Sequence, residues 1–256
     1  MAQIDSPIAR FDPTSEELIV INNAIQVESV GCAARFDVDR DPYVYVSLAE
    51  AASLSNRYGL FDSAWVAQHG YTPQEPPQSD GAEWNPSHRE LEVLTGFDAN
   101  GDPSTLTDNS GKVIPVDGCF GEAGRAVFPE TRADVELQTL VLSGLDYSLG
   151  RMANDSRVLG VFDEWASCMD GKGYQISSVE ERSQTISDMR EKGSSSELKL
   201  ASADVECSQE VNSPGIQHAV DRAYQERWLT EHGSELKAVH EAYEEGLERA
   251  KKILAG

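Results

Sequence analysis

The chain has 256 residues, of which 39% are hydrophobic and 25% are charged, with 20 glycines and 11 prolines. These proportions are typical of a globular protein that buries a core, and they exclude a disordered or collagen-like chain. With 44 acidic and 21 basic residues the formal net charge is −23, which disfavours nucleic acid and anionic membrane surfaces as partners.

Short helices joined by loops are predicted for the first part of the chain. Thr14 with Glu17 three residues later forms a capping box, and apolar residues at helical spacing then run to Phe36, so Cys32 lies near the end of a long first helix. Further helices are predicted at 47–57, 86–95 and 118–128. Residues 72–85 contain three prolines and several polar residues, which indicates a surface loop.

One small β-hairpin is predicted near residues 104–117. Two short runs of β-forming residues, Thr105–Thr107 and Val113–Val116, flank the turn sequence Asp108–Gly111. Pro115 would confine its strand to an edge, because proline has no N–H to give to a ladder.

The second part of the chain has an almost wholly helical pattern. The candidate helices are 131–149, 154–171, 178–192, 195–211 and 215–254. In the last helix, apolar residues seven apart predict an amphipathic helix docked on its own domain; they are Leu229, Leu236, Tyr243 and Ala250. A coiled-coil dimer is the alternative, but Gly233 and His240 interrupt its second seam.

We therefore expect a mainly α protein, helical and bundle-like, with two associated halves. The N-terminal half, residues 1–128, carries the proline-rich loop and the hairpin, and the C-terminal half, residues 129–256, ends in the long amphipathic helix. Each half has an aromatic-flanked cysteine helix followed by a second cysteine, so the halves could be distant repeats.

No catalytic or metal-binding motif is found, and the sequence indicates no cofactor. HExxH, GxSxG and glycine-rich phosphate loops are absent. Asp98–Asp102 begins like a calcium loop, but Pro103 occupies the sixth position and Asn109 the twelfth, so we interpret it as a turn. His88 as a general base would need a nucleophile that the sequence does not identify.

Three aromatic residues around the proline-rich loop are the candidate ligand-binding residues: Trp65, Tyr71 and Trp84. Aromatic side chains with polar tips suit the rim of a binding site. They equally suit a small satellite core that holds down a long loop, and the sequence leaves both interpretations open.

The four cysteines are Cys32, Cys119, Cys168 and Cys207. They form no CxxC pair, and no histidine stands at a zinc-ligand spacing beside them, so a zinc site is not predicted. Four buried thiols in a cytosolic protein and two disulfides in an exported protein both fit this count.

Several short motifs together resemble a family of uncharacterised secreted or lipid-anchored proteins of actinobacteria such as Streptomyces. The motifs lie at 32–36, 57–59, 70–71, 94–96, 118–123, 165–174 and 204–207, and Trp228 follows in a long charged helix. Ala33 stands where methionine is usual in that family, and Asp37 where glycine is usual. The resemblance implies an export signal upstream of Met1, although the polar start of the chain contains none. It carries no established activity.

The cysteines and the resemblance together imply an extracellular or cell-surface protein, whether lipid-anchored or free. We expect the sequential disulfides Cys32–Cys119 and Cys168–Cys207, because each half then closes its own bridge. We expect a monomeric, non-enzymatic binding protein without a transmembrane segment. Its partner would be a neutral or cationic protein, peptide or small molecule, since the acid excess attracts positive ligands. The alternatives are an immunity or sequestration protein for a secreted antimicrobial peptide, and a hydrolase with an unrecognised site.

Overall fold

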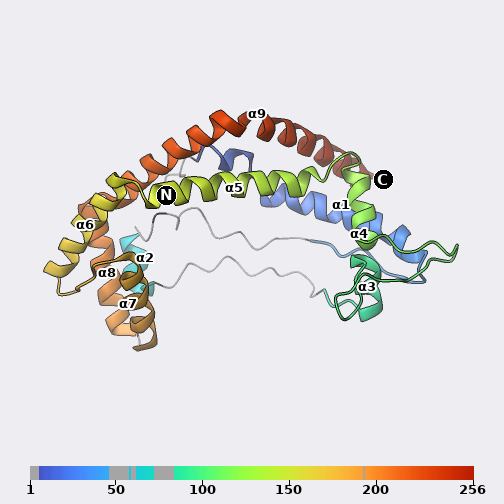
Figure 1. Ribbon diagram of the computed structural model, residues 1–256. Helices are drawn as coiled ribbons and strands as arrows, with labels where there is room; N and C mark the ends of the chain where they lie inside the picture. The colour runs from blue at the N-terminus through green and yellow to red at the C-terminus, as the bar shows by residue number, and fades with distance from the viewer. Residues whose placement is uncertain (1–5, 46–57, 59–61, 72–83, 193) are drawn as a thin grey trace. The chain divides into compact units, whose positions relative to one another are not determined.

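The computed structural model describes residues 6–45, 58, 62–71, 84–192 and 194–256. In these residues the fold is mainly α, as predicted, with nine helices and 71% helical content (Figure 1). They contain no strand, although a β-hairpin was predicted. A short 3-10 helix, η1, spans Ala9–Phe11. The helix predicted at 47–57 and nearly all of the 72–85 loop lie outside the described residues.

The chain divides into two compact units that interleave along the sequence. Unit 1 comprises Met1–Arg10, Ala51–Pro76 and Ser143–Glu231. Unit 2 comprises Phe11–Glu50, Pro77–Leu142 and His232–Gly256. Each unit therefore takes segments from both of the sequential halves, 1–128 and 129–256, that we expected from the sequence.

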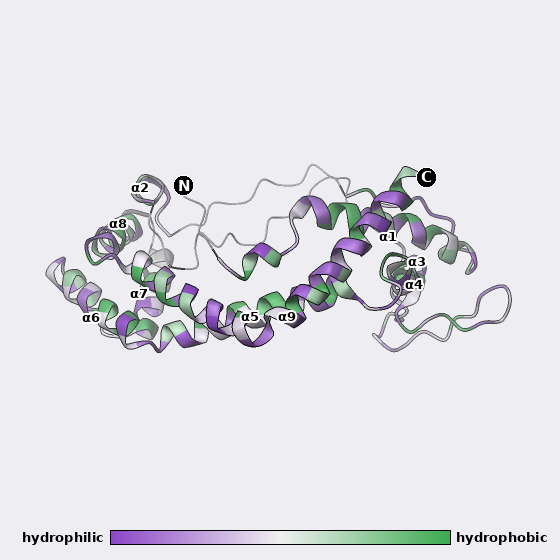
Figure 2. Ribbon diagram, turned by 90° about the horizontal axis from the view of Figure 1, so that it is seen from above, coloured by the Kyte–Doolittle hydropathy of each residue, from purple (hydrophilic) through white to green (hydrophobic). Residues whose placement is uncertain are grey.

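Unit 2 is built around three helices, α1 (Ser15–Ala34), α3 (His88–Thr95) and α4 (Gly118–Val127), and α1 packs against both of the others. The predicted capping box is confirmed at the start of α1. The views in Figures 1 and 2 both show α3 beside α4. Their shared core consists of Cys32, Ala33, Phe36, Val38, Val93, Leu94, Ile114 and Cys119.

Unit 1 is centred on α8 (Ser194–Glu210), which contacts α2 (Ser63–His69), α6 (Ser156–Gly171) and α7 (Val179–Lys192). Its main core consists of Trp165, Met169, Ile176, Leu200, Ala203 and Cys207. Helix α2 was not predicted from the sequence, because seven residues are too few to show a helical period. Its start is visible only as a cap: the Asp62 carboxylate accepts hydrogen bonds from the backbone of Ala64 and Trp65.

Two long helices, α5 (Ala133–Ala153) and α9 (Ser213–Ala255), contribute residues to both units. Figure 2 shows hydrophilic (purple) and hydrophobic (green) residues recurring along α9, as expected for an amphipathic helix. The predicted heptad positions Leu236, Tyr243 and Ala250 are buried within unit 2. The remaining heptad position, Leu229, is half-buried. Three of the four predicted positions therefore lie in the core, as an amphipathic helix requires.

The predicted hairpin near residues 104–117 is corrected by the structure, which has the turn but no strands. A single bridge joins Thr107 to Val113. The Asp108 carboxylate accepts hydrogen bonds from the backbone N–H groups of Ser110 and Lys112, so the side chain organises the loop. Ile114 donates its backbone N–H to the Leu106 carbonyl at 2.9 Å, but Leu106 donates its own N–H to the Ser104 hydroxyl at 3.2 Å, so the pairing goes no further. Asp98–Asp102 forms a turn of the same kind, as we interpreted it from the sequence.

Both predicted disulfides, Cys32–Cys119 and Cys168–Cys207, are confirmed, with Cα–Cα distances of 5.5 and 5.7 Å. Each is accompanied by an ion pair between residues that lie within four positions of its cysteines. Arg35 pairs with Glu122 at 2.6 Å beside the first bridge. Lys172 pairs with Glu206 at 2.7 Å beside the second.

The same helix-ending turn follows the first cysteine of each bridge. The fifth residue after each cysteine has a positive φ, 56° for Asp37 and 87° for Gly173. The next residue donates its backbone N–H across the turn, from Val38 to Ala33 at 3.2 Å and from Tyr174 to Met169 at 2.9 Å. Such a turn ends many unrelated helices, so the interpretation of the two cysteine helices as distant repeats stays a prediction.

Candidate functional site

An extended segment after α1 alternates between buried and exposed side chains over residues 36–41. The buried side chains are Phe36, Val38 and Arg40. The exposed side chains are Asp37, Asp39 and Asp41. Phe36 and Asp37 belong to the turn that ends α1, and from Val38 onward the period of two is that of an extended chain with one face on a core. No strand pairs with the segment among the described residues.

Farther along this segment, side-chain amides of α1 take the place of a neighbouring strand. Asn23 accepts a hydrogen bond from the backbone N–H of Tyr45 at 2.7 Å and donates one to its carbonyl oxygen at 3.0 Å. The amide group has the same donor and acceptor as a peptide unit, so it satisfies the exposed backbone. The chain from residue 36 to residue 45 is thereby held against α1.

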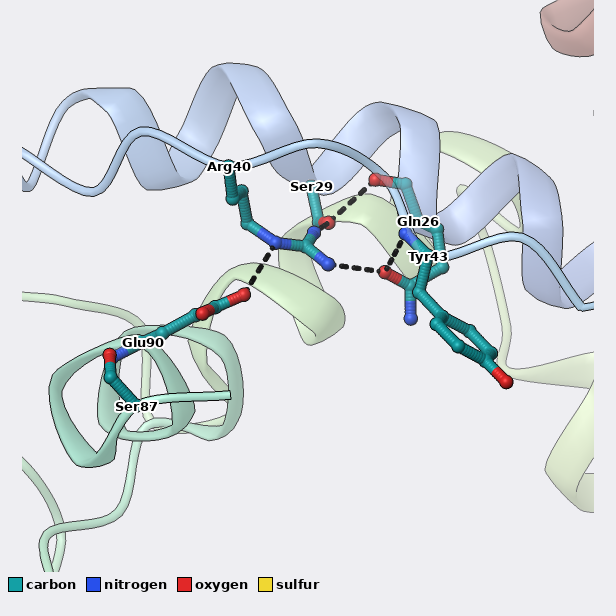
Figure 3. Close-up of polar contacts among 6 residues, drawn as sticks. All are labelled: Gln26, Ser29, Arg40, Tyr43, Ser87 and Glu90. Atoms are coloured by element: carbon teal, nitrogen blue, oxygen red, sulfur yellow. Dashed lines mark hydrogen bonds and ion pairs between the residues drawn. The ribbon is translucent and has the colours of Figure 1, made fainter. Parts of the chain in front are cut away.

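Arg40 is the charged residue at the centre of this arrangement, and its side chain is only 3% exposed. Figure 3 shows its guanidinium between three partners. Nη2 donates to Gln26 at 2.6 Å, Nη1 to the Ser29 hydroxyl at 2.7 Å, and Nε to the Glu90 carboxylate at 3.0 Å. The same Gln26 oxygen accepts the backbone N–H of Tyr43 at 3.4 Å. A buried cation thus ties α1, α3 and the extended segment together.

A buried charge is tolerated only when its counter-charge and hydrogen-bond partners are in place. Glu90 is positioned by the start of α3, where its backbone N–H donates to the Ser87 side chain at 3.1 Å. Ser29 in turn donates its hydroxyl proton to the Gln26 carbonyl at 2.7 Å. The partners of Arg40 are therefore themselves held, and the segment has a single well-defined position.

Four aromatic rings form a connected surface next to this network, which we call the aromatic face: Tyr43, Tyr45, Trp84 and Phe120. The two tyrosine rings meet edge to face at 4.7 Å. The Trp84 ring lies 6.3 Å from Tyr43 and 6.2 Å from Phe120, and its residue is 36% exposed. Rings that are half-buried and prealigned offer apolar area to a ligand at low entropic cost.

The other two predicted ligand-binding residues, Trp65 and Tyr71, lie together in unit 1, where both pack against α8 residues. The Trp65 ring stacks on His69 at 3.8 Å. Trp84 belongs to unit 2 and shares no cluster with them. Trp65 and Tyr71 as ligand contacts remain predictions of the sequence.

Tyr71 has a clear structural role, because its hydroxyl donates to the buried Asp204 carboxylate at 2.8 Å. Trp165 Nε1 and Arg182 donate to the same carboxylate at 3.0 and 2.7 Å. Burial, reinforced by the negative charge of Asp204, raises the pKa of the Tyr71 hydroxyl. Tyr71 is thus a neutral hydrogen-bond donor at physiological pH.

His88 is exposed at the first position of α3, and no hydrogen bond joins its imidazole to another described residue. In the described part of the chain, no group of three histidine, cysteine or acidic residues could hold a metal ion. The described helices include none that is long and apolar enough to cross a bilayer.

The sequence reasoning found Trp84 but missed Tyr43, Tyr45 and the network around Arg40. A signal was present in the alternation of aspartates with Phe36, Val38 and Arg40, which points the arginine inward. No known protein family, curated protein or solved structure matches this chain.

Proposed function

We propose that this chain is a non-enzymatic binding protein of an extracytoplasmic compartment and that its ligand contacts the aromatic face. The observation that carries the proposal is the aromatic face itself, with Trp84 36% exposed beside Tyr43. The Arg40 network supports it, because a surface positioned before the ligand arrives loses little conformational entropy on binding.

Two features support the compartment. The two disulfides are typical of proteins that fold under oxidising conditions. The resemblance to secreted and lipid-anchored actinobacterial proteins points the same way. Labelling free thiols in the native host without reductant tests this location: an extracytoplasmic protein has no thiol to label, whereas four labelled thiols would place it in a reducing compartment.

Binding is tested by a thermal-shift screen of neutral and cationic peptides and oligosaccharides. A ligand that binds only the folded state raises Tm. We expect the shift to disappear in Trp84→Ala, to persist in Trp84→Phe, and to remain in Trp65→Ala. If the Tm shift is lost in Trp65→Ala and in no other variant, the binding site lies in unit 1. A hydrolytic turnover that is abolished by His88→Ala would replace the binding role with an enzymatic one.

A further inference from the structure

The exposed side of the extended segment carries three carboxylates in a row, which we call the aspartate row: Asp37, Asp39 and Asp41. Asp37 accepts a hydrogen bond from the Asn109 side chain at 3.2 Å. Among the described residues, Asp39 and Asp41 form no ion pair. The aspartate row ends two residues before Tyr43, so it adjoins the aromatic face.

The cations nearest in sequence do not neutralise this row. Arg40 is directed inward and pairs with Glu90. Arg35 pairs with Glu122 at 2.6 Å. The exposed Arg89 donates to the carbonyl oxygen of Phe36 at 3.3 Å, next to Asp37, and no ion pair connects it to Asp39 or Asp41. Within the described part of the chain, the carboxylates of Asp39 and Asp41 are therefore available to a positive ligand.

The spacing of the row defines the shape of that ligand. Asp37 lies in the turn that ends α1, with a φ of 56°, so the extended part of the row is Asp39 and Asp41. Alternate residues of an extended chain lie about 7 Å apart on one side. A second extended peptide presents its own alternate side chains at the same interval, so two lysines or arginines at alternate positions would match Asp39 and Asp41, and a third would reach Asp37 at the end of the row. The rings of Tyr43 and Trp84 would then receive a following apolar residue or a further cation, through cation–π contact.

We propose that the aromatic face and the aspartate row together dock an extended cationic peptide segment, with basic residues at alternate positions followed by an apolar residue. This inference rests on the proposed binding function and names its ligand class. It fits the sequestration of a cationic peptide, since the net charge of −23 raises the local concentration of such a ligand.

Isothermal titration calorimetry with three synthetic peptides tests the proposal on the full, disulfide-bonded chain. The first is Lys-Ser-Lys-Ser-Lys-Ser-Phe, the second is Lys-Lys-Lys-Ser-Ser-Ser-Phe, and the third carries glutamate in place of each lysine of the first. We expect the first to bind most tightly and the third not at all. Raising the salt from about 20 mM to about 300 mM should weaken the binding, because exposed charges are screened.

Matched variants locate the site. Asp39→Asn with Asp41→Asn should weaken binding of the first peptide about tenfold or more, and Trp84→Ala should also weaken it. Asp163→Asn with Asp170→Asn removes the same charge from exposed positions of α6 in unit 1 and should leave affinity unchanged. Unchanged Tm values in all variants show that the fold is intact.

Three outcomes overturn the proposal. The first is an equal loss of affinity in the Asp39/Asp41 variant and in the Asp163/Asp170 variant. The others are equal affinity for the first two peptides and no binding of the first peptide at low salt. If the cationic peptides do not bind but neutral ligands bind and lose affinity in Trp84→Ala, only the proposed cationic ligand is wrong, and the proposed binding function stands. If neither neutral nor cationic probes bind through Trp84, the proposed function fails as well.

Discussion

Gly96 and Gly118 face each other where α3 ends and α4 begins: a Cβ atom on Gly118 would lie 2.5 Å from the backbone nitrogen of Gly96. A Cβ on Gly96 would lie 2.5 Å from the carbonyl oxygen of Val116. Both glycines have positive φ, 80° and 60°. The approach of the two helices therefore depends on the absence of side chains at both positions.

Gly118→Ala should destabilise unit 2 by about 3 kcal/mol, through backbone strain and the clash with α3 together. Gly111→Ala is the matched control, because Gly111 has a φ of 85° but nothing within 4 Å of its Cβ position. It should cost only the left-handed strain, about 1–2 kcal/mol. Urea unfolding measures both, and equal losses would show that the close approach of Gly96 and Gly118 does not matter.

Replacing both cysteines of a bridge by alanine should destabilise the protein in proportion to the logarithm of the loop it closes. The sequence separations are 87 residues for Cys32–Cys119 and 39 for Cys168–Cys207. In the chain-entropy account these loops correspond to about 4.6 and about 4 kcal/mol. Denaturant titration of the two double variants checks this. Losses below about 1 kcal/mol would mean that the unfolded chain is already compact.

Removing the hydroxyl group from two buried tyrosines should change the stability of the protein in opposite directions. Tyr71→Phe leaves the buried Asp204 without one donor, so it should destabilise by about 1–2 kcal/mol. The Tyr243 hydroxyl is buried and has no hydrogen-bond partner in the described part of the chain. Tyr243→Phe should therefore stabilise by about 1 kcal/mol, measured by thermal or urea unfolding. A clear destabilisation would reveal an unseen partner of that hydroxyl.

Removing the counter-charge of Arg40 should be costly. Glu90→Ala leaves a guanidinium that is 3% exposed without its carboxylate, and we expect a loss of about 2–3 kcal/mol. Glu28→Ala is the control, since Glu28 is an exposed carboxylate on α1. It should change stability by less than about 0.5 kcal/mol. Similar effects of both substitutions would show that the Arg40–Glu90 pair is energetically unimportant.

Asp155 should make the protein sensitive to acid. Hydrogen bonds from the Arg157 side chain and backbone, joined by Tyr224, hold the pKa of this carboxyl well below its ordinary value of 3.8. Because the folded pKa is lower than the unfolded one, its stabilising effect is complete above the unfolded value and disappears as the pH falls through the folded one. Asp155→Asn should flatten the dependence of unfolding free energy on pH below about 4. NMR titration of the carboxyl carbon checks the pKa itself, and an ordinary value there would contradict the prediction.

Local signals predicted the helices well, because each helix start and end depends on a few adjacent residues. Thr14 and Glu17 form the capping box that their spacing indicates. Gly96 ends α3 in the left-handed conformation, as glycine does at that position. Helix α2 was not predicted, because seven residues are too few to show a helical period. Two strands were predicted beside the Asp108 turn, but the structure has only a single bridge there, because the turn forms without strands.

What the sequence by itself determined is the helical class and the bounds of most helices, since these follow from local periodicity and caps. The disulfide pairing was a prediction, because the cysteine count alone fits free thiols equally well. Only the tertiary structure decided that the units interleave along the chain and that the partner of Arg40 is Glu90, fifty residues away. The physical reason is that burying a charge depends on partners distant in sequence, which no local pattern around Arg40 specifies. The aromatic face depends on the same burial, because the network around Arg40 places Tyr43 within 6.3 Å of Trp84.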